Sequence, residues 1–161
     1  MNWLDILLVL LIVIRAFFGW KRGFVGAMVS LGGVAIAVLL ASNFYKPLSK
    51  ELSFMPSEGL SNILAFVVIL SCVDVVATLL ARVLKFATSL IKLGLVNKIG
   101  GAVFGFLTGA TEWAALLAAW VKFFGAGLVT ESIVAKVLLY QVPLISLLLP
   151  GEFDIIHSFF Q

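Results

Sequence analysis

Three ionisable residues lie inside long apolar stretches of the sequence, where a charged side chain is costly in a membrane. Arg15 interrupts LLVLLIVIRAFFGW, Asp74 interrupts FVVILSCVDVVATLLA, and Glu112 follows the glycine-rich stretch NKIGGAVFGFLTGAT. Ionisable residues at membrane depth usually face other protein groups or a water-filled path, and they line proton and ion pathways. The chemistry that these three residues could support is therefore charge pairing or proton transfer.

The depths of the three residues indicate which of them could pair. Counted from the basic ends of their segments at 1.5 Å per residue, Arg15 lies about 10 Å deep, Asp74 about 12 Å and Glu112 about 18 Å. Because Arg15 and Asp74 match in depth, we predict a buried ion pair between them, with Glu112 either protonated or close enough to share Arg15. Two interpretations stay open: the groups line a proton, ion or polar substrate path, or they fix the packing of a helical bundle.

Glycines recur every four residues just before Glu112. At 100° per residue, Gly101, Gly105 and Gly109 fall within about 80° of one helix face, and Glu112 shares that face. Small side chains let a neighbouring helix approach closely, which matters in lipid because apolar burial gives helices no reason to associate. We predict that this face, and a weaker one with Gly26 and Gly33, packs against another helix.

The composition indicates that the elements carrying these residues are membrane helices. Of the 161 residues, 63% are hydrophobic and 12% are charged, whereas a soluble domain has about 25% charged residues. So few charges could not cover the apolar faces of a soluble fold. The formal net charge of +3 then concerns orientation in the membrane, and no nucleic-acid partner is expected.

The apolar stretches predict an all-α integral membrane protein with one membrane domain over residues 1–161. A helix needs about 20 mainly apolar residues to cross the hydrocarbon core, and four stretches qualify. The predicted spans are residues 3–20, 24–41, 62–81 and 99–121. No basic region precedes the first apolar stretch, so a retained helix is expected there instead of a cleaved signal peptide.

Two further helices are predicted at the membrane surface. The first covers residues 82–95 on the cytoplasmic side, with a basic edge that would contact anionic headgroups. The interfacial basic residues are Arg22, Arg82, Lys85 and Lys92. The second covers residues 131–149 as an interfacial or re-entrant helix, and a fifth span is the alternative. The lipid bilayer, including its anionic headgroups, is therefore an expected partner.

The basic residues also predict the orientation. In a four-span arrangement the turn after the first span and the connection after the third contain six basic residues and no acidic one, namely Lys21, Arg22, Arg82, Lys85, Lys92 and Lys98. The positive-inside rule places both connections in the cytoplasm and both termini outside it. A fifth span would return only the C-terminus to the cytoplasm.

Residue types typical of enzymes and metalloproteins are scarce. The chain has one cysteine, Cys72, and one histidine, His157, so a Cys/His metal cluster is not expected. No arrangement of nucleophile, base and orienting acid and no glycine-lysine phosphate loop can be identified. We therefore predict no catalytic residue, no cofactor, no metal and no enzymatic activity.

Three short motifs resemble a known family. WLD at residues 3–5, KRGFVGAMVSL at 21–31 and NKIGGAVFGFLTGA at 97–110 are together similar to the CvpA family, the colicin V production proteins of bacterial inner membranes. The resemblance covers about residues 3–120. It implies a small multi-pass inner-membrane protein associated with production or export of a peptide toxin (a bacteriocin), and more generally with envelope homeostasis.

The resemblance also implies which positions recur in the family. Asp5, Arg22, Gly23, Gly101, Gly105 and Gly109 occupy such positions. Asn97 stands where relatives usually have Asp, and Thr108 stands where several have Arg. These two departures weaken any claim that a charged pair around the glycine-rich helix is essential.

Two functions from different classes fit these observations. The first is a non-enzymatic scaffold or accessory factor that packs against a membrane-protein partner, or against further copies of itself, through its glycine faces. The second is a small ion- or proton-coupled transporter or channel subunit that uses Arg15, Asp74 and Glu112 as a relay.

Overall fold

The computed structural model describes residues 2–52, 54–88, 94–127 and 129–141. Within these ranges every regular element is a helix, and four of the helices are long and apolar enough to cross a membrane. The helices are α1 (Trp3–Arg22), α2 (Phe24–Glu51), α3 (Glu58–Thr88), α4 (Gly94–Phe124) and α5 (Ile133–Gln141). The predicted fold class, an all-α membrane protein with four spans, is confirmed.

Local capping fixes where α1 begins. Asn2 Oδ1 accepts a hydrogen bond from Trp3 N at 2.8 Å, and Asp5 Oδ2 accepts one from Asn2 N at 2.8 Å. This reciprocal arrangement satisfies backbone N–H groups that have no partner within the helix. Lys21 and Arg22 in the last turn complement the negative end of the helix dipole.

A single glycine joins α1 to α2. Gly23 has φ +84°, a left-handed conformation that residues with a Cβ atom rarely adopt. Asn97 of α4 lies against this turn, and its Oδ1 accepts a hydrogen bond from Phe24 N at 2.7 Å. Asn97 therefore caps α2 from a different helix.

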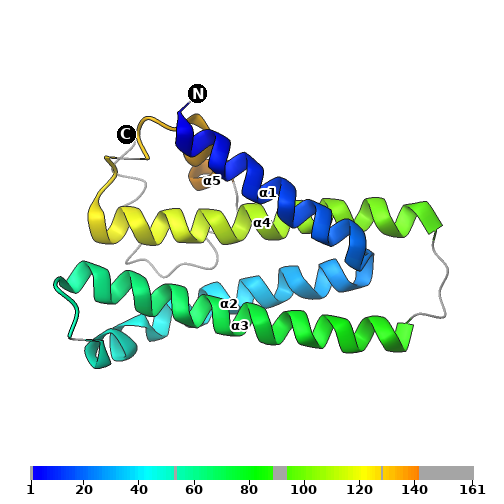
Figure 1. The fold of residues 1–161 in the computed structure, drawn as a ribbon, viewed down its shortest axis with the longest axis horizontal. Helices are drawn as coiled ribbons and strands as arrows, with labels where there is room; N and C mark the ends of the chain where they lie inside the picture. Colours follow the sequence, from blue (N-terminus) through cyan, green and yellow to red (C-terminus); the bar gives the residue numbers. More distant parts are fainter. Residues whose placement is uncertain (1, 53, 89–93, 128, 142–161) are drawn as a thin grey trace.

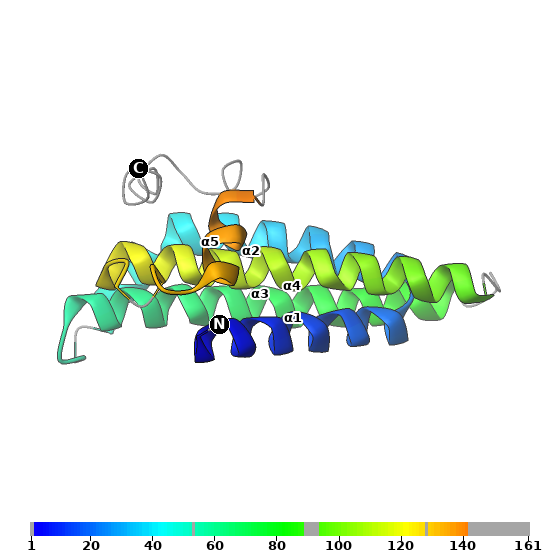
Figure 2. The same ribbon diagram turned by 90° about the horizontal axis from the view of Figure 1, so that it is seen from above.

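The four long helices lie roughly side by side, and α4 is central (Figure 1). α1 packs along α4, whereas α2 packs along both α3 and α4. Seen from above, α4 lies between α2 and α1 (Figure 2). The turn between α1 and α2, the end of α3 and the beginning of α4 all lie at the same end of the bundle, as four alternating spans require (Figure 1).

The core between α2, α3 and α4 combines a few large side chains with many alanines. Phe66, Val34 and Val38 are fully buried. Five alanines of α4 are also buried, namely Ala110, Ala114, Ala115, Ala118 and Ala119. Large apolar side chains cover the outer surface of every long helix, which suits contact with lipid acyl chains.

The glycine face of α4 packs directly against the backbone of α1. A Cβ atom on Gly105 would lie 2.7 Å from the Arg15 carbonyl oxygen and 2.9 Å from Gly19 Cα. One on Gly101 would overlap the Gly19 carbonyl, and one on Gly109 would lie 2.9 Å from Arg15 Cβ. Within the chain, α1 therefore occupies this face of α4.

The second small-residue face is also used inside the chain. A Cβ atom on Gly33 would overlap the Ala77 side chain of α3. Gly26 is buried too, and a Cβ atom there would lie 3.3 Å from Arg22 Cβ. The close packing of α2 on α3 thus depends on Gly33. In the same way, the close packing of α1 on α4 depends on Gly105.

Two helix ends differ from the sequence prediction. α3 continues to Thr88, so residues 82–88 extend a spanning helix and do not begin a separate surface helix; the stretch contains neither Gly nor Pro to interrupt the helix. α2 runs to Glu51, past Pro47. The described part of α5 covers nine residues, Ile133–Gln141, and the predicted interfacial or re-entrant helix stays a prediction. Residues 89–93 and 142–149 of the two predicted surface helices lie outside the described residues.

The glycine packing gives a matched test. Replacing Gly105 with Ala should lower the melting temperature, because overpacking a close contact costs about 1–3 kcal/mol. Replacing Gly32 with Ala should not, because nothing lies within 4 Å of a Cβ atom there and Ala is favoured over Gly in helices by up to about 1 kcal/mol. Thermal unfolding of both purified variants in detergent measures the difference, and equal melting temperatures would contradict the α1–α4 contact.

Candidate functional site: an ion-paired triad between three helices

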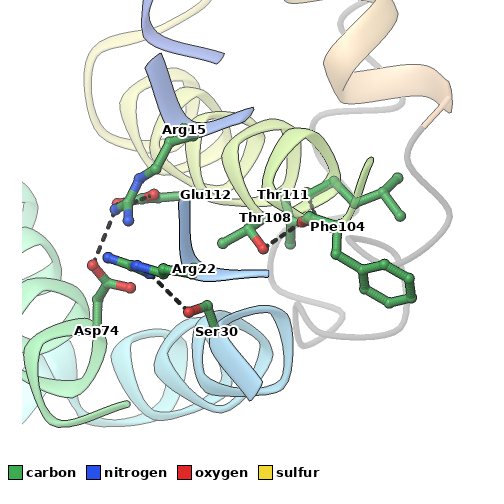
Figure 3. Close-up of polar contacts among 9 residues, drawn as sticks. Arg15, Arg22, Ser30, Asp74, Phe104, Thr108, Thr111 and Glu112 are labelled. Carbon is green, nitrogen blue, oxygen red and sulfur yellow. Dashed lines mark hydrogen bonds and ion pairs between the residues drawn. The ribbon is translucent and has the colours of Figure 1, made fainter. Parts of the chain in front are cut away.

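Arg15, Asp74 and Glu112 come from three different helices and meet at one point (Figure 3). Arg15 Nη2 lies 3.0 Å from Asp74 Oδ2 and 2.5 Å from a Glu112 carboxylate oxygen. α1, α3 and α4 are therefore joined through a single guanidinium group. The structure brings together the residues that the sequence singled out, with Glu112 sharing Arg15 with Asp74.

The triad is largely removed from solvent. The exposed fractions are 21% for the Arg15 side chain, 15% for Asp74 and 11% for Glu112. Asp74 Oδ1 is buried and lacks a hydrogen bond among the described residues, whereas Glu112 Oε2 is buried 2.5 Å from Arg15 Nη2. Ion pairs in such surroundings stabilise only when every charge is compensated, and removing one partner is strongly destabilising.

Arg22 brings a second positive charge near the triad. It donates a hydrogen bond to Ser30 Oγ at 2.8 Å, and it points into the space between Ser30 and Asp74 (Figure 3). Arg22 is half-buried. The sequence assigned it to the headgroup layer because it follows the first span, but its long side chain turns back into the protein.

The neighbouring hydroxyl groups do not extend the triad. Thr108 Oγ1 donates to the Phe104 carbonyl at 2.7 Å, and Thr111 Oγ1 donates to the Leu107 carbonyl at 2.9 Å. Both are bonds within α4, which is the usual way for a threonine to satisfy its hydroxyl inside a membrane helix. The triad thus contains one guanidinium and two carboxylates, with Arg22 beside it.

The remaining predicted basic residues are only partly described. Arg82 lies near the end of α3 and is exposed. The side chains of Lys85 and Lys92 lie outside the described part of the chain. Whether they contact headgroups stays a prediction.

A second polar centre, which sequence reasoning did not find, surrounds Asp5. Asp5 is 1% exposed. Its Oδ1 accepts hydrogen bonds from Ser132 Oγ at 2.5 Å and from Val134 N at 2.9 Å. Asp5 thereby holds the N-terminus of α5, where Ser132 Oγ also accepts a hydrogen bond from Ala135 N at 3.0 Å. The sequence carries no signal for a contact with a serine 127 positions away.

The comparison with known families decides the classification. A model described as "Colicin V production protein" matches residues 4–143. The chain belongs to the colicin V production protein family. The match extends beyond the motifs in residues 3–120, so it includes the triad, Asp5 and all of α5.

A curated relative agrees with membrane insertion. The chain is 24% identical over 122 residues to an uncharacterized transmembrane protein, YshB, of Bacillus subtilis (strain 168). That alignment covers 65% of this chain and 69% of the relative. No solved structure matches the chain. The family and this relative together support a membrane protein of the colicin V production family.

Removing the charges singly and together tests the triad. Arg15→Met should destabilise the protein by about 3–5 kcal/mol, because it leaves two carboxylates without their cation. The triple variant Arg15→Met, Asp74→Asn, Glu112→Gln should recover much of this loss, since no unpaired charge remains. Thermal unfolding in detergent measures both, with Lys98→Met as an exposed control. A triple variant as unstable as Arg15→Met alone would argue against pairing.

The Asp5 centre predicts a local effect at the other end of the bundle. Asp5→Ala should release α5, because each hydrogen bond to a charged group contributes about 1.5–3 kcal/mol. Limited proteolysis should then cut between α4 and α5 faster than in the unchanged protein. Asp5→Asn keeps one carbonyl acceptor and should be cut more slowly than Asp5→Ala. Equal cutting of all three proteins would mean that Asp5 does not hold α5.

Proposed function

We propose that this protein is a non-enzymatic accessory protein or scaffold of the bacterial inner membrane, used in production or export of a peptide toxin and in envelope homeostasis. The family supports the link to toxin production. The observation that carries the scaffold assignment is the triad, because both carboxylates lie within 3.0 Å of the same guanidinium nitrogen. Such an arrangement is typical of ion pairs that hold helices together, since the charges compensate one another without moving.

A partner protein must use a surface other than the glycine faces. Those faces are filled by α1 and by α3. The outer apolar side chains of the long helices remain as the contact surface for another membrane protein or for a second copy of the chain. Such contacts would rely on packing of large side chains and on few polar groups.

The distribution of basic residues supports one orientation. Lys21 and Arg22 at the end of α1 and Lys98 near the beginning of α4 lie at the same end of the bundle. By the positive-inside rule this end faces the cytoplasm. In a four-span arrangement both termini are then outside the cytoplasm.

One observation favours the alternative of a small ion- or proton-coupled transporter or channel subunit. Arg15 lines a hollow of about 550 Å³, and its partner Asp74 keeps one buried oxygen without a hydrogen bond among the described residues. A relay needs groups that can exchange partners, and this oxygen could accept a proton. The alternative therefore predicts flux that depends on Glu112.

A flux measurement separates the two functions. Under the accessory hypothesis, the purified protein in liposomes should carry no more protons or monovalent ions than empty liposomes. Flux that Glu112→Gln abolishes would overturn the accessory assignment in favour of transport. Flux unchanged by Glu112→Gln would contradict both, because the triad is then not the pathway.

A complementation measurement tests the accessory role directly. Cells that lack the gene should secrete less of a colicin V-type peptide toxin, and the unchanged protein should restore secretion. Glu112→Gln should restore it too, because glutamine still offers Arg15 a hydrogen-bond acceptor. Gly105→Leu should not, because the side chain cannot fit against the Arg15 carbonyl. Normal secretion without the gene would refute the role.

A further inference from the structure

A basic hollow opens beside the triad, on the side of α1 that faces α3. Its volume is about 550 Å³, within the range of ordinary ligand sites. Four of its lining residues are cationic, namely Arg15, Lys21, Arg22 and Arg82. We propose that this hollow binds one anionic phospholipid, with the phosphate held by Arg22 and Arg82 and an acyl chain lying along α1 toward Leu11. This goes beyond the proposed function and holds for either candidate.

The charge in the hollow calls for an anion. No carboxylate is among its lining residues, and both triad carboxylates are already bound to Arg15. Arg22 donates to the neutral Ser30 hydroxyl, and neither it nor Arg82 forms an ion pair within the described ranges. Guanidinium groups match phosphate oxygens in geometry and form the stronger class of hydrogen bond with them.

The whole hollow is about as long as one lipid leaflet is thick. The hollow extends along α1 from Arg22 to Leu11, with Ile14 and Phe18 between them. The eleven steps from Leu11 to Arg22 rise about 16 Å along the helix, close to half of the roughly 30 Å hydrocarbon core. Lys21, Arg22 and Arg82 thus lie toward the headgroups, and Leu11, Ile14 and Phe18 lie where an acyl chain would run. A soluble anion would use only the first of these features. Arg15 lies among these apolar residues, but its charge is compensated by Asp74 and Glu112.

A second, apolar hollow continues the same path. It has a volume of about 210 Å³ and shares Leu11 and Trp113 with the basic hollow. Trp3 and Trp120 line its further part. The acyl chain of a lipid seated at Arg22 thus meets continuous apolar surface past Leu11, and Trp113 lies at the junction as a natural reporter.

Native mass spectrometry of the full chain in mild detergent tests the proposal. Phosphatidylglycerol should bind more tightly than phosphatidylcholine. Arg82→Gln should weaken phosphatidylglycerol binding about fivefold, the effect expected of one basic residue beside anionic lipid, and Arg82→Lys should keep most of it. Lys98→Gln is the matched control, because Lys98 is exposed at the same end of the bundle and does not line the hollow.

Several outcomes would overturn the proposal. Equal losses in Lys98→Gln and Arg82→Gln would mean diffuse attraction to headgroups. Equal binding of phosphatidylcholine would mean that the charge is not recognised. Displacement of phosphatidylglycerol by soluble glycerol phosphate at comparable concentration would mean a site for free phosphate compounds and not for lipid.

Trp113 gives an independent measurement that does not depend on binding in detergent. In a variant with Phe at positions 3, 20 and 120, Trp113 is the only remaining tryptophan. Phosphatidylglycerol with bromine on its acyl chain, diluted into phosphatidylcholine vesicles, should quench Trp113 more than brominated phosphatidylcholine does. Ile14→Phe narrows the hollow without adding a second tryptophan. It should reduce the difference in quenching between the two lipids. Equal quenching by the two lipids would contradict the site.

Discussion

One interaction constrains the whole structure: the guanidinium of Arg15 must be compensated inside an apolar bundle. An uncompensated charge at membrane depth costs about 2.5–3.5 kcal/mol even on insertion scales, so a carboxylate has to come within reach. Glu112 can do so only if α1 lies close to α4, and Gly105 and Gly109 provide that closeness because a Cβ atom at either would collide with Arg15. The glycines and the carboxylate of α4 therefore serve the same contact.

Much of this arrangement could be predicted from sequence, because the position of a residue in a membrane helix gives its depth along the membrane normal. Helices of known rise place Arg15 and Asp74 at the same level, and a charge in lipid has few alternatives to pairing. Lateral neighbours are a different matter. Gly19 carries no periodic signal of its own, yet its backbone contacts Gly101 and Gly105. The inward turn of Arg22 likewise depends on where Ser30 lies, which helix length alone does not determine.

The departure at position 97 shows why a residue type can change while its role is kept. Asn97 accepts the hydrogen bond from Phe24 N that caps α2. An aspartate, which the family resemblance leads one to expect there, offers the same acceptor oxygen and the same side-chain length. The requirement at this position is a short side chain with an oxygen, because the acceptor must reach across the turn at Gly23. A negative charge is not part of that requirement.

The hollow beside α1 follows from the same geometry as the triad. α1 packs along α4 and barely approaches α3 among the described residues, so Asp74 is reached only because the arginine side chain is long. The long side chain of Arg15 keeps the two helix backbones apart. The basic hollow lies beside this side chain, and Arg22 and Arg82 line it as well. A shorter cation at position 15 would require α1 to move toward α3 and would close the space. The ion triad and the basic hollow are thus two consequences of placing an arginine, and not a smaller residue, between α1 and α3.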